Sequence, residues 1–190
     1  MGQTSSMKQP NCSEIKGLQT CDNRLIPENY TGIMFCCLNG KVKELRNYKN
    51  GIVDGFCIEW FENGQIKSEI NFKEGKFHGL SRWWYANGQF SIEANYKDGE
   101  HEGSVRSWFE NGQISQEENY KNGLENGLIR WWFESGKLEF EGNYIEGKND
   151  GLSRRWYENG QKDIEWIYKD GVIISETCWD ENGNLIKCVN

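Results

Sequence analysis

The stretch from Leu80 to Tyr96, LSRWWYANGQFSIEANY, carries the pattern that decides the fold. Asn87-Gly88 is typical of a two-residue type I′ turn, because both central residues of that turn need a positive φ. Aromatic and branched residues, which favour strands, lie on both sides of this dipeptide. The stretch therefore predicts one β-hairpin, in which Arg82 lies opposite Glu93.

The same pattern recurs every 24 residues along the chain. Its tryptophan is found at Trp60, Trp84, Trp108, Trp132 and Trp156. A column of glycines keeps the same period, at Gly40, Gly64, Gly88, Gly112, Gly136 and Gly160. A fixed period of this size indicates a repeat architecture, in which each unit buries its faces against its neighbours. We therefore expect an all-β fold, an elongated, single-layer, twisted antiparallel sheet of stacked β-hairpins.

The repeats also suggest how the chain is divided. Residues 30–190 form the expected repeat array of about seven hairpins, the last of them truncated. Residues 1–29 lie outside the period, and we expect them to form a separate N-terminal segment or cap.

Alternation along the strands assigns the side chains to two faces. In the Leu80–Tyr96 hairpin we expect Trp83 and Phe90 on a mostly apolar face, and Trp84 on a polar face. Opposite charges that face each other across each hairpin fix its register, because a one-residue slip would separate all of them. Four such pairs are expected, and they are Arg82–Glu93, Arg106–Glu117, Arg130–Glu141 and Arg154–Glu165.

The charge balance narrows the classes of partner. The formal net charge is −7 and the sequence pI is about 5.0. Such a protein repels phosphate backbones, so we expect no nucleic acid partner. No stretch has the ~20 apolar residues that span a bilayer. Seven cysteines cannot all pair within one monomer, which favours a reducing, cytoplasmic location; membrane or particle association is the alternative.

Two stretches carry a family resemblance. WFENGQISQEENYKNGLENG (residues 108–127) and WYENGQKDIEWIYKDG (residues 156–171) resemble the MORN-variant repeat. The resemblance implies a meandering sheet of β-hairpins and a binding or scaffolding role, since the family has no common active site. Many bacterial members are labelled antitoxins of the YwqK type. Other MORN proteins are linked to membranes, phosphoinositides and cytoskeletal assemblies.

Residues that depart from the repeat pattern are the better candidates for contacts with a partner, because the fold does not need them in every repeat. These candidates are Trp83, Trp131, Arg155 and Trp166. Packing in a local core is their alternative role. The tryptophan column supplies further candidates, which also suit packing between neighbouring hairpins, and these are Trp84, Trp108 and Trp132.

The termini suggest modifications and cross-links. The start of the chain fits the N-myristoylation pattern with Gly2 as the acceptor, and we expect a membrane contact only if Gly2 carries the acyl chain. A two-residue turn at Asn182-Gly183 would place Cys178 and Cys188 on opposite faces, which predicts no disulfide between them. Whether Cys12 pairs with Cys21 stays open.

No nucleophile elbow, phosphate loop or metal-ligand spacing appears, so we expect no enzyme activity, no cofactor and no metal site. The leading hypothesis is a scaffold or adaptor that binds a protein partner through the faces of the hairpins. The alternatives are an antitoxin or immunity-type inhibitor of a toxic protein, and a structural protein associated with a membrane or particle. Open sheet edges would also permit self-association.

Overall fold

The structure is a computed structural model, and it describes residues 8–14, 19–20 and 26–188. Within these residues the chain is all-β, apart from one short 3-10 turn. The chain divides into two compact units, Met1–Gly99 (unit 1) and Glu100–Asn190 (unit 2).

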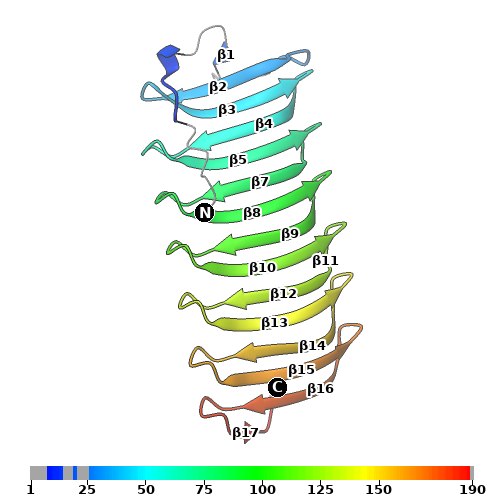
Figure 1. Cartoon of the computed structure of the whole chain (residues 1–190). Helices are drawn as coiled ribbons and strands as arrows, with labels where there is room; N and C mark the ends of the chain where they lie inside the picture. The colour runs from blue at the N-terminus through cyan, green and yellow to red at the C-terminus, as the bar shows by residue number, and fades with distance from the viewer. Residues whose placement is uncertain (1–7, 15–18, 21–25, 189–190) are drawn as a thin grey trace. The chain divides into compact units, whose positions relative to one another are not determined.

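Unit 1 is a meander that starts from a short parallel pair. β1 lies parallel to β2, and the later strands of this unit pair antiparallel in sequence order, with β5 pairing with both β6 and β7 (Figure 1). The elements are η1 (Cys12–Glu14), β1 (Gln19–Thr20), β2 (Gly32–Leu38), β3 (Lys41–Lys49), β4 (Ile52–Trp60), β5 (Ile66–Lys73), β6 (Lys76–Phe77), β7 (Gly79–Trp84) and β8 (Phe90–Lys97).

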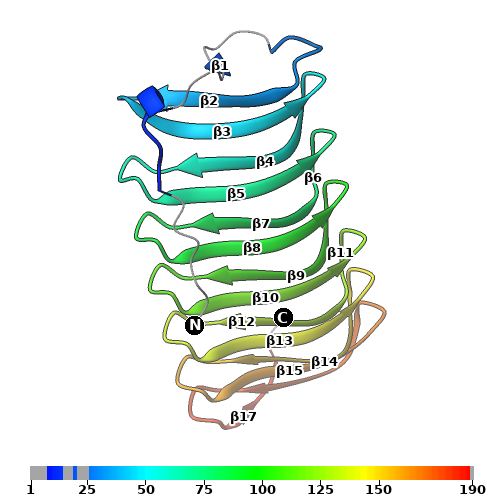
Figure 2. The same ribbon diagram turned by 45° about the horizontal axis from the view of Figure 1, so that its top comes forward.

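Unit 2 repeats the same antiparallel meander, and Figure 2 shows the strands of each unit side by side in one layer. The prediction of stacked hairpins is therefore confirmed in both units. The strands are β9 (Glu100–Trp108), β10 (Ile114–Lys121), β11 (Leu124–Glu125), β12 (Gly127–Trp132), β13 (Leu138–Ile145), β14 (Lys148–Trp156), β15 (Lys162–Lys169), β16 (Val172–Trp179) and β17 (Leu185–Ile186).

The turn at Asn87-Gly88 differs from the predicted two-residue turn. The Tyr85 amide donates to the Gln89 carbonyl and the Gly88 amide to the Tyr85 carbonyl, both at 2.9 Å, so that three residues form the loop. Only Gly88 has a positive φ, of 87°. This is a type I turn followed by a bulge at the glycine. The Asn87 side chain favours it, because its Oδ1 accepts a hydrogen bond from the Gln89 amide at 2.9 Å.

Two-residue turns occur at the other end of the hairpins. Between β5 and β6, Lys73 pairs with Lys76 across Glu74-Gly75, whose φ values are 51° and 79°. Two positive φ values define the type I′ turn that the sequence suggested for Asn87-Gly88. The same pair of positive φ values recurs at the equivalent positions 50–51, 98–99, 122–123, 146–147 and 170–171. In the first hairpin it also occurs at Asn39-Gly40, the position that holds a three-residue loop in the later hairpins.

The predicted pairing of Arg82 with Glu93 is confirmed, although the predicted type of turn at Asn87-Gly88 is wrong. Arg82 faces Glu93, as expected, because a bulge that adds Ser91 to β8 reverses the shift made by the longer loop. Between the loop and this bulge, the observed pairing is shifted by one residue from the predicted pairing. Trp84 therefore pairs with Phe90. Their rings stack with centroids 5.4 Å apart. The prediction that Trp84 and Phe90 lie on opposite faces is therefore wrong.

The two faces are packed differently. The ladder face carries the Arg–Glu pairs and Trp84. The other, here called the aromatic face, carries Trp83 and Tyr96. In each unit the centre of this face carries buried residues one repeat apart, which are Cys57 and Ser81 in unit 1 and Val105, Ile129 and Ser153 in unit 2. Because these residue types differ from repeat to repeat, the sequence pattern does not reveal the column.

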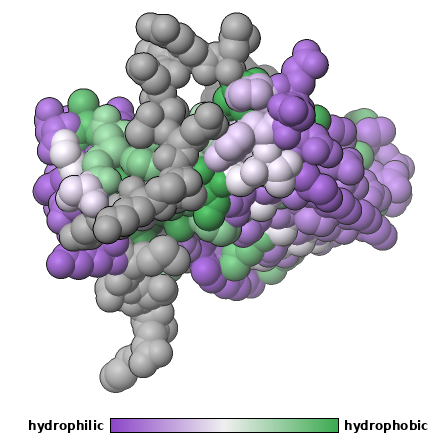
Figure 3. Space-filling view, turned by 90° about the horizontal axis from the view of Figure 1, so that it is seen from above, coloured by the Kyte–Doolittle hydropathy of each residue, from purple (hydrophilic) through white to green (hydrophobic). Residues whose placement is uncertain are grey.

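The N-terminal segment covers the ladder face of the first hairpin. The Cys12 amide donates to the Gly40 carbonyl at 3.0 Å, and the Val42 amide donates to the Pro10 carbonyl at 3.1 Å. A small core forms beside this segment, from Phe35, Val42, Ile58 and Trp60. In Figure 3, seen from the β1–β2 end, hydrophobic residues lie in the middle of the visible face and hydrophilic residues at its sides.

The position of the N-terminal segment on the first hairpin allows one disulfide to form. Cys12 bonds to Cys37, so Cys12 is not available to Cys21, which lies outside the described residues. The sequence left the Cys12–Cys21 pair open because nothing in it places the N-terminal segment beside β2 and β3.

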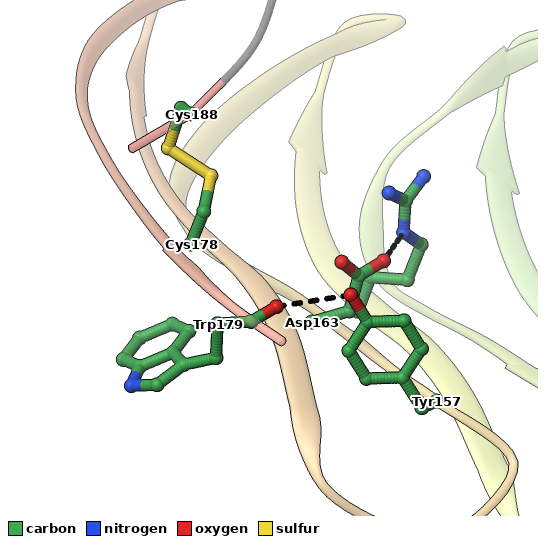
Figure 4. Close-up of a disulfide and its surroundings, with 6 residues drawn as sticks. Tyr157, Asp163, Cys178, Trp179 and Cys188 are labelled. Atoms are coloured by element: carbon green, nitrogen blue, oxygen red, sulfur yellow. Dashed lines mark hydrogen bonds and ion pairs between the residues drawn. A yellow bond between two sulfur atoms is a disulfide. The ribbon is translucent and has the colours of Figure 1, made fainter. Parts of the chain in front are cut away.

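A second disulfide joins Cys178 to Cys188 (Figure 4), which the sequence predicted not to form. The error lies in the last turn. The Asp180 amide donates to the Asn184 carbonyl at 2.9 Å across a three-residue loop, so that Cys178 pairs with Ile186. A two-residue turn would have paired it one residue later, and one residue of register exchanges the faces. Cys188, two residues after Ile186, thus lies on the same face as Cys178.

Candidate functional site

Three of the residues that depart from the repeat pattern lie close together on β12, β14 and β15 in unit 2, two of them beside Phe140. Trp131 on β12 pairs with Phe140 on β13, and their ring centroids lie 4.7 Å apart. Arg155 on β14 pairs with Phe140 from the other side. The Arg155 guanidinium carbon lies 5.6 Å from the centroid of the Trp166 ring on β15. We call these four residues the Phe140 cluster.

Two carboxylates border the Phe140 cluster. Glu118 accepts hydrogen bonds from Trp131 Nε1 at 3.3 Å and from the Tyr120 hydroxyl at 2.8 Å. Asp163 accepts one from Arg155 Nε at 2.5 Å. Burial, and then the hydrogen bond to Glu118, raise the pKa of the Tyr120 hydroxyl, which therefore stays protonated at neutral pH. With two carboxylates to one guanidinium, this surface carries a net negative charge that favours a cationic group of a ligand.

Exposure differs within the cluster. Phe140 is buried, Trp131 and Trp166 are half-buried, and Arg155 is exposed. The buried ring thus supports neighbours whose outer edges remain accessible. Tryptophan and arginine in such a setting are the residue types that dominate binding energy at protein interfaces. The sequence missed Phe140, although it too departs from its column, where Ser68, Ile92, Gln116 and Ile164 occupy the equivalent positions.

His101 lies next to this surface. Its ring packs against Tyr120 with centroids 5.0 Å apart. Burial lowers the pKa of His101, and the nearby Glu118 carboxylate partly opposes that shift. The side chain is therefore neutral at neutral pH.

Trp83, in unit 1, has a different environment. Its ring centroid lies 6.4 Å from those of Phe77 and Tyr96, and the centroids of Phe77 and Tyr96 lie 5.0 Å apart. Ser81 and Ala94 in the adjacent register are fully buried. These contacts suit a packing role for Trp83, and its contact with a partner stays a prediction.

The tryptophan column lies on the ladder face, away from Trp83 and Trp131. Trp84 stacks on Phe90, while Trp108 pairs with Ile114 and Trp132 pairs with Leu138. All three tryptophans are half-buried within their own hairpins. Their part in binding is also untested.

The Arg–Glu pairs are all present and form a longer array than predicted. Within the hairpins the closest N–O distances are 2.8 Å for Arg82–Glu93, 3.0 Å for Arg106–Glu117, 3.6 Å for Arg130–Glu141 and 3.0 Å for Arg154–Glu165. Strands of successive hairpins also place Glu117 opposite Arg130 and Glu141 opposite Arg154. In unit 2 the charges therefore alternate without a break, in the order Arg106, Glu117, Arg130, Glu141, Arg154 and Glu165.

This array gives a pH-dependent prediction. Hydrogen bonds from Lys162 and Arg154, both at 3.0 Å, hold the pKa of Glu165 below its usual value. A lowered pKa in the folded state stabilises the protein above the unfolded pKa of about 4.3, and this contribution is lost as the pH falls through the folded pKa. We expect the free energy of unfolding to fall as the pH is lowered below about 5, and Glu165→Gln to reduce that slope.

Urea unfolding at a series of pH values tests this expectation. Glu158→Gln is the control, because Glu158 is exposed and lies outside the charge array. Equal pH slopes for the two variants would contradict the role given to Glu165.

The remaining candidate residue, Gly2, lies outside the described residues. In the part of the chain that the structure describes, no helix has the length and hydrophobicity needed to cross a membrane.

Comparison with known families matches the repeat directly. The model of the MORN repeat variant fits residues 54–74, 77–98, 102–122, 125–146 and 149–170, which together are more than half of the chain. The chain belongs to the MORN repeat variant family. Each matched MORN repeat ends at the first residue of a type I′ turn. One MORN repeat is thus a hairpin with a three-residue loop, joined to the next by a type I′ turn.

Repeats of the MORN type commonly bind proteins or membranes, and the family is generally non-catalytic. A search of the curated proteins found no match. The predicted MORN resemblance is confirmed, whereas the antitoxin function remains a prediction.

Proposed function

We propose that this MORN repeat chain is a non-catalytic scaffold that binds a protein partner through the Phe140 cluster. The observation that supports it is the placement of Trp131 and Arg155 on either side of one buried ring, with Trp166 next to Arg155. The fold does not need these side chains in every repeat, because the equivalent positions hold other residues. A surface that unites three such departures suits a specific contact better than the positions that every repeat shares.

The charge of the chain indicates the chemistry of the partner. Glu118 and Asp163 border the cluster, and the whole chain has a formal net charge of −7. A protein that offers a basic side chain between Trp131 and Trp166 would gain cation–π and ion-pair contacts. The proposal therefore favours a basic protein as the partner.

The proposal also includes the redox setting in which the protein acts. The disulfides Cys12–Cys37 and Cys178–Cys188 are of a kind that persists in oxidising surroundings. They support an oxidising setting over the reducing cytoplasm that the odd number of cysteines suggested. Alkylation before and after reduction, followed by mass spectrometry of the protein from its source, would test this: four protected thiols from these two bonds are expected.

The binding proposal is tested by capture with the full tagged chain and then by calorimetry with the purified partner. Trp131→Ala removes an aromatic contact of the cluster, and we expect it to weaken binding by about 2 kcal/mol, or roughly 30-fold. Arg155→Glu, by contrast, should strengthen the binding of a basic partner, because it replaces the one cationic charge of the cluster with a carboxylate.

Trp132→Ala is the matched control, since Trp132 is the next residue on β12 and lies on the ladder face. Binding should persist in this variant. Binding that survives Trp131→Ala and is lost with Trp132→Ala would assign the contact to the ladder face. Capture of no stoichiometric partner would count against a scaffold.

A further inference from the structure

Over most of its length, one side of β16 in unit 2 pairs with no strand of the residues that the structure describes. On one side it pairs with β15 from Val172 to Cys178. On the other side β17 covers only Cys178 and Trp179, and no described strand pairs with residues 172–177 there. A row of backbone N–H and C=O groups is thus available to another strand.

The side chains of this edge are unusually apolar for a surface. Val172 is 65% exposed, Ile173 46% and Ile174 64%. The adjoining β17 adds Leu185 at 71% and Ile186 at 48%. Contiguous exposed aliphatic residues of this kind mark interaction sites in soluble proteins.

β16 also lacks most of the devices that protect exposed edges. Its sequence, VIISETCW, has no lysine and no proline, and a single acidic residue, Glu176. It contains one bulge, because Ile173 and Ser175 face the adjacent residues Tyr168 and Ile167 and leave Ile174 as the additional residue. That additional residue is aliphatic and exposed, so it favours association.

We propose that a second copy of this chain occupies the edge, with the two β16 strands antiparallel about a two-fold axis at Ile174. In this register Ile174 faces its equivalent, Ile173 faces Ser175, and Val172 faces Glu176 of the second copy. Each Glu176 is therefore opposite an aliphatic side chain, and the two like charges are kept apart. The same patch serves both copies, as a closed two-fold interface requires.

The position of β1 argues against a head-to-tail arrangement, in which β16 of one copy would pair with β2 of the next copy. A second copy could extend the meander only by placing its own β2 against β16. The β2 strand already carries β1 as a parallel neighbour at Met34 and Phe35. Pairing between equivalent β16 edges avoids that conflict and gives a closed dimer, whereas head-to-tail pairing would give open fibres.

Sedimentation equilibrium of the full oxidised chain tests the proposal. We expect a dimer for the natural sequence and a monomer for Ile174→Lys, with the dimer dissociation constant raised by more than about tenfold because a charge enters the pairing edge. Ile145→Lys is the matched control: Ile145 is 50% exposed on β13, and this variant should remain dimeric. Thermal unfolding should show that both variants are folded.

Cysteine cross-linking tests the register. Ile174→Cys places two thiols directly across the axis, at a Cα separation of about 4.5–5.5 Å that suits a disulfide. We expect it to form a covalent dimer on oxidation. Val172→Cys, at a position that is equally exposed, faces Glu176 and should not. A monomeric natural chain, a dimeric Ile174→Lys, higher oligomers, or equal cross-linking of the two cysteine variants would each overturn the proposal.

Discussion

Gly51→Ala is expected to lower the free energy of unfolding by about 2–5 kcal/mol, which is one of the two largest effects that we expect from substitutions in this chain. Gly51 has a φ of 75°, which costs a residue with a Cβ about 1–2 kcal/mol. The new Cβ would also lie 2.8 Å from the Pro27 carbonyl oxygen and 2.9 Å from the Glu28 Cα. These are backbone atoms, so the clash requires movement of the chain and adds about 1–3 kcal/mol.

Gly40→Ala is the matched control for this prediction. Gly40 lies in the same type of turn with a φ of 78°, but a Cβ added there meets no atom within 4 Å. We expect only the conformational cost of about 1–2 kcal/mol. Urea unfolding of both variants gives the comparison. Equal losses of stability would show that the backbone at Pro27 and Glu28 moves aside without cost.

The double substitution Cys12→Ser and Cys37→Ser is expected to cost about 3–4 kcal/mol of stability. The sequence separation of 25 makes the loop closed by this disulfide longer than that of Cys178–Cys188, where the separation is 10. Loss of the bond should also release the segment that packs beside Trp60, which is only 3% exposed. Hydrogen exchange should become faster at the Val42 amide, which donates to the Pro10 carbonyl.

Removal of the other disulfide separates this local effect from a general loss of stability. Cys178→Ser with Cys188→Ser should speed exchange in β17 and leave the Val42 amide protected. Unchanged exchange at Val42 after Cys12→Ser and Cys37→Ser would show that the N-terminal segment stays in place without its covalent bond.

The sequence was sufficient for the period, the strands and the charge register, because a strict spacing of glycines, aromatics and charges expresses all three. It was misleading at the turns. Asn-Gly suits a type I′ turn as well as a type I turn with a glycine bulge, and the choice depends on a hydrogen bond from the Gln89 amide to the Asn87 side chain. The Arg82–Glu93 prediction succeeded only because the Ser91 bulge cancelled the error. At Asp180–Asn184 the same error had no compensation before Cys188, and the disulfide prediction failed.

The candidate surface was predictable as a set of residues and not as an arrangement. Departure from the repeat pattern identified Trp131, Arg155 and Trp166 individually. Phe140 brings Trp131 and Arg155 together, because it faces Trp131 on one neighbouring strand and Arg155 on the other. That relation joins two different repeats, so inspection of one hairpin at a time does not show it.

The alternating charges on the ladder face make this chain modular in units of one repeat. Each of Glu117 and Glu141 lies between arginines on both neighbouring strands, and Arg130 lies between two glutamates. If a whole segment of 24 residues is duplicated or excised between equivalent positions, arginine again meets glutamate at the new junction. A segment that is not a multiple of 24 residues would oppose unlike columns, and one with an odd number of residues would also exchange the faces. Recombination can therefore change the number of repeats without disrupting the arginine–glutamate pairing, whereas a change in the length of one repeat would disrupt it.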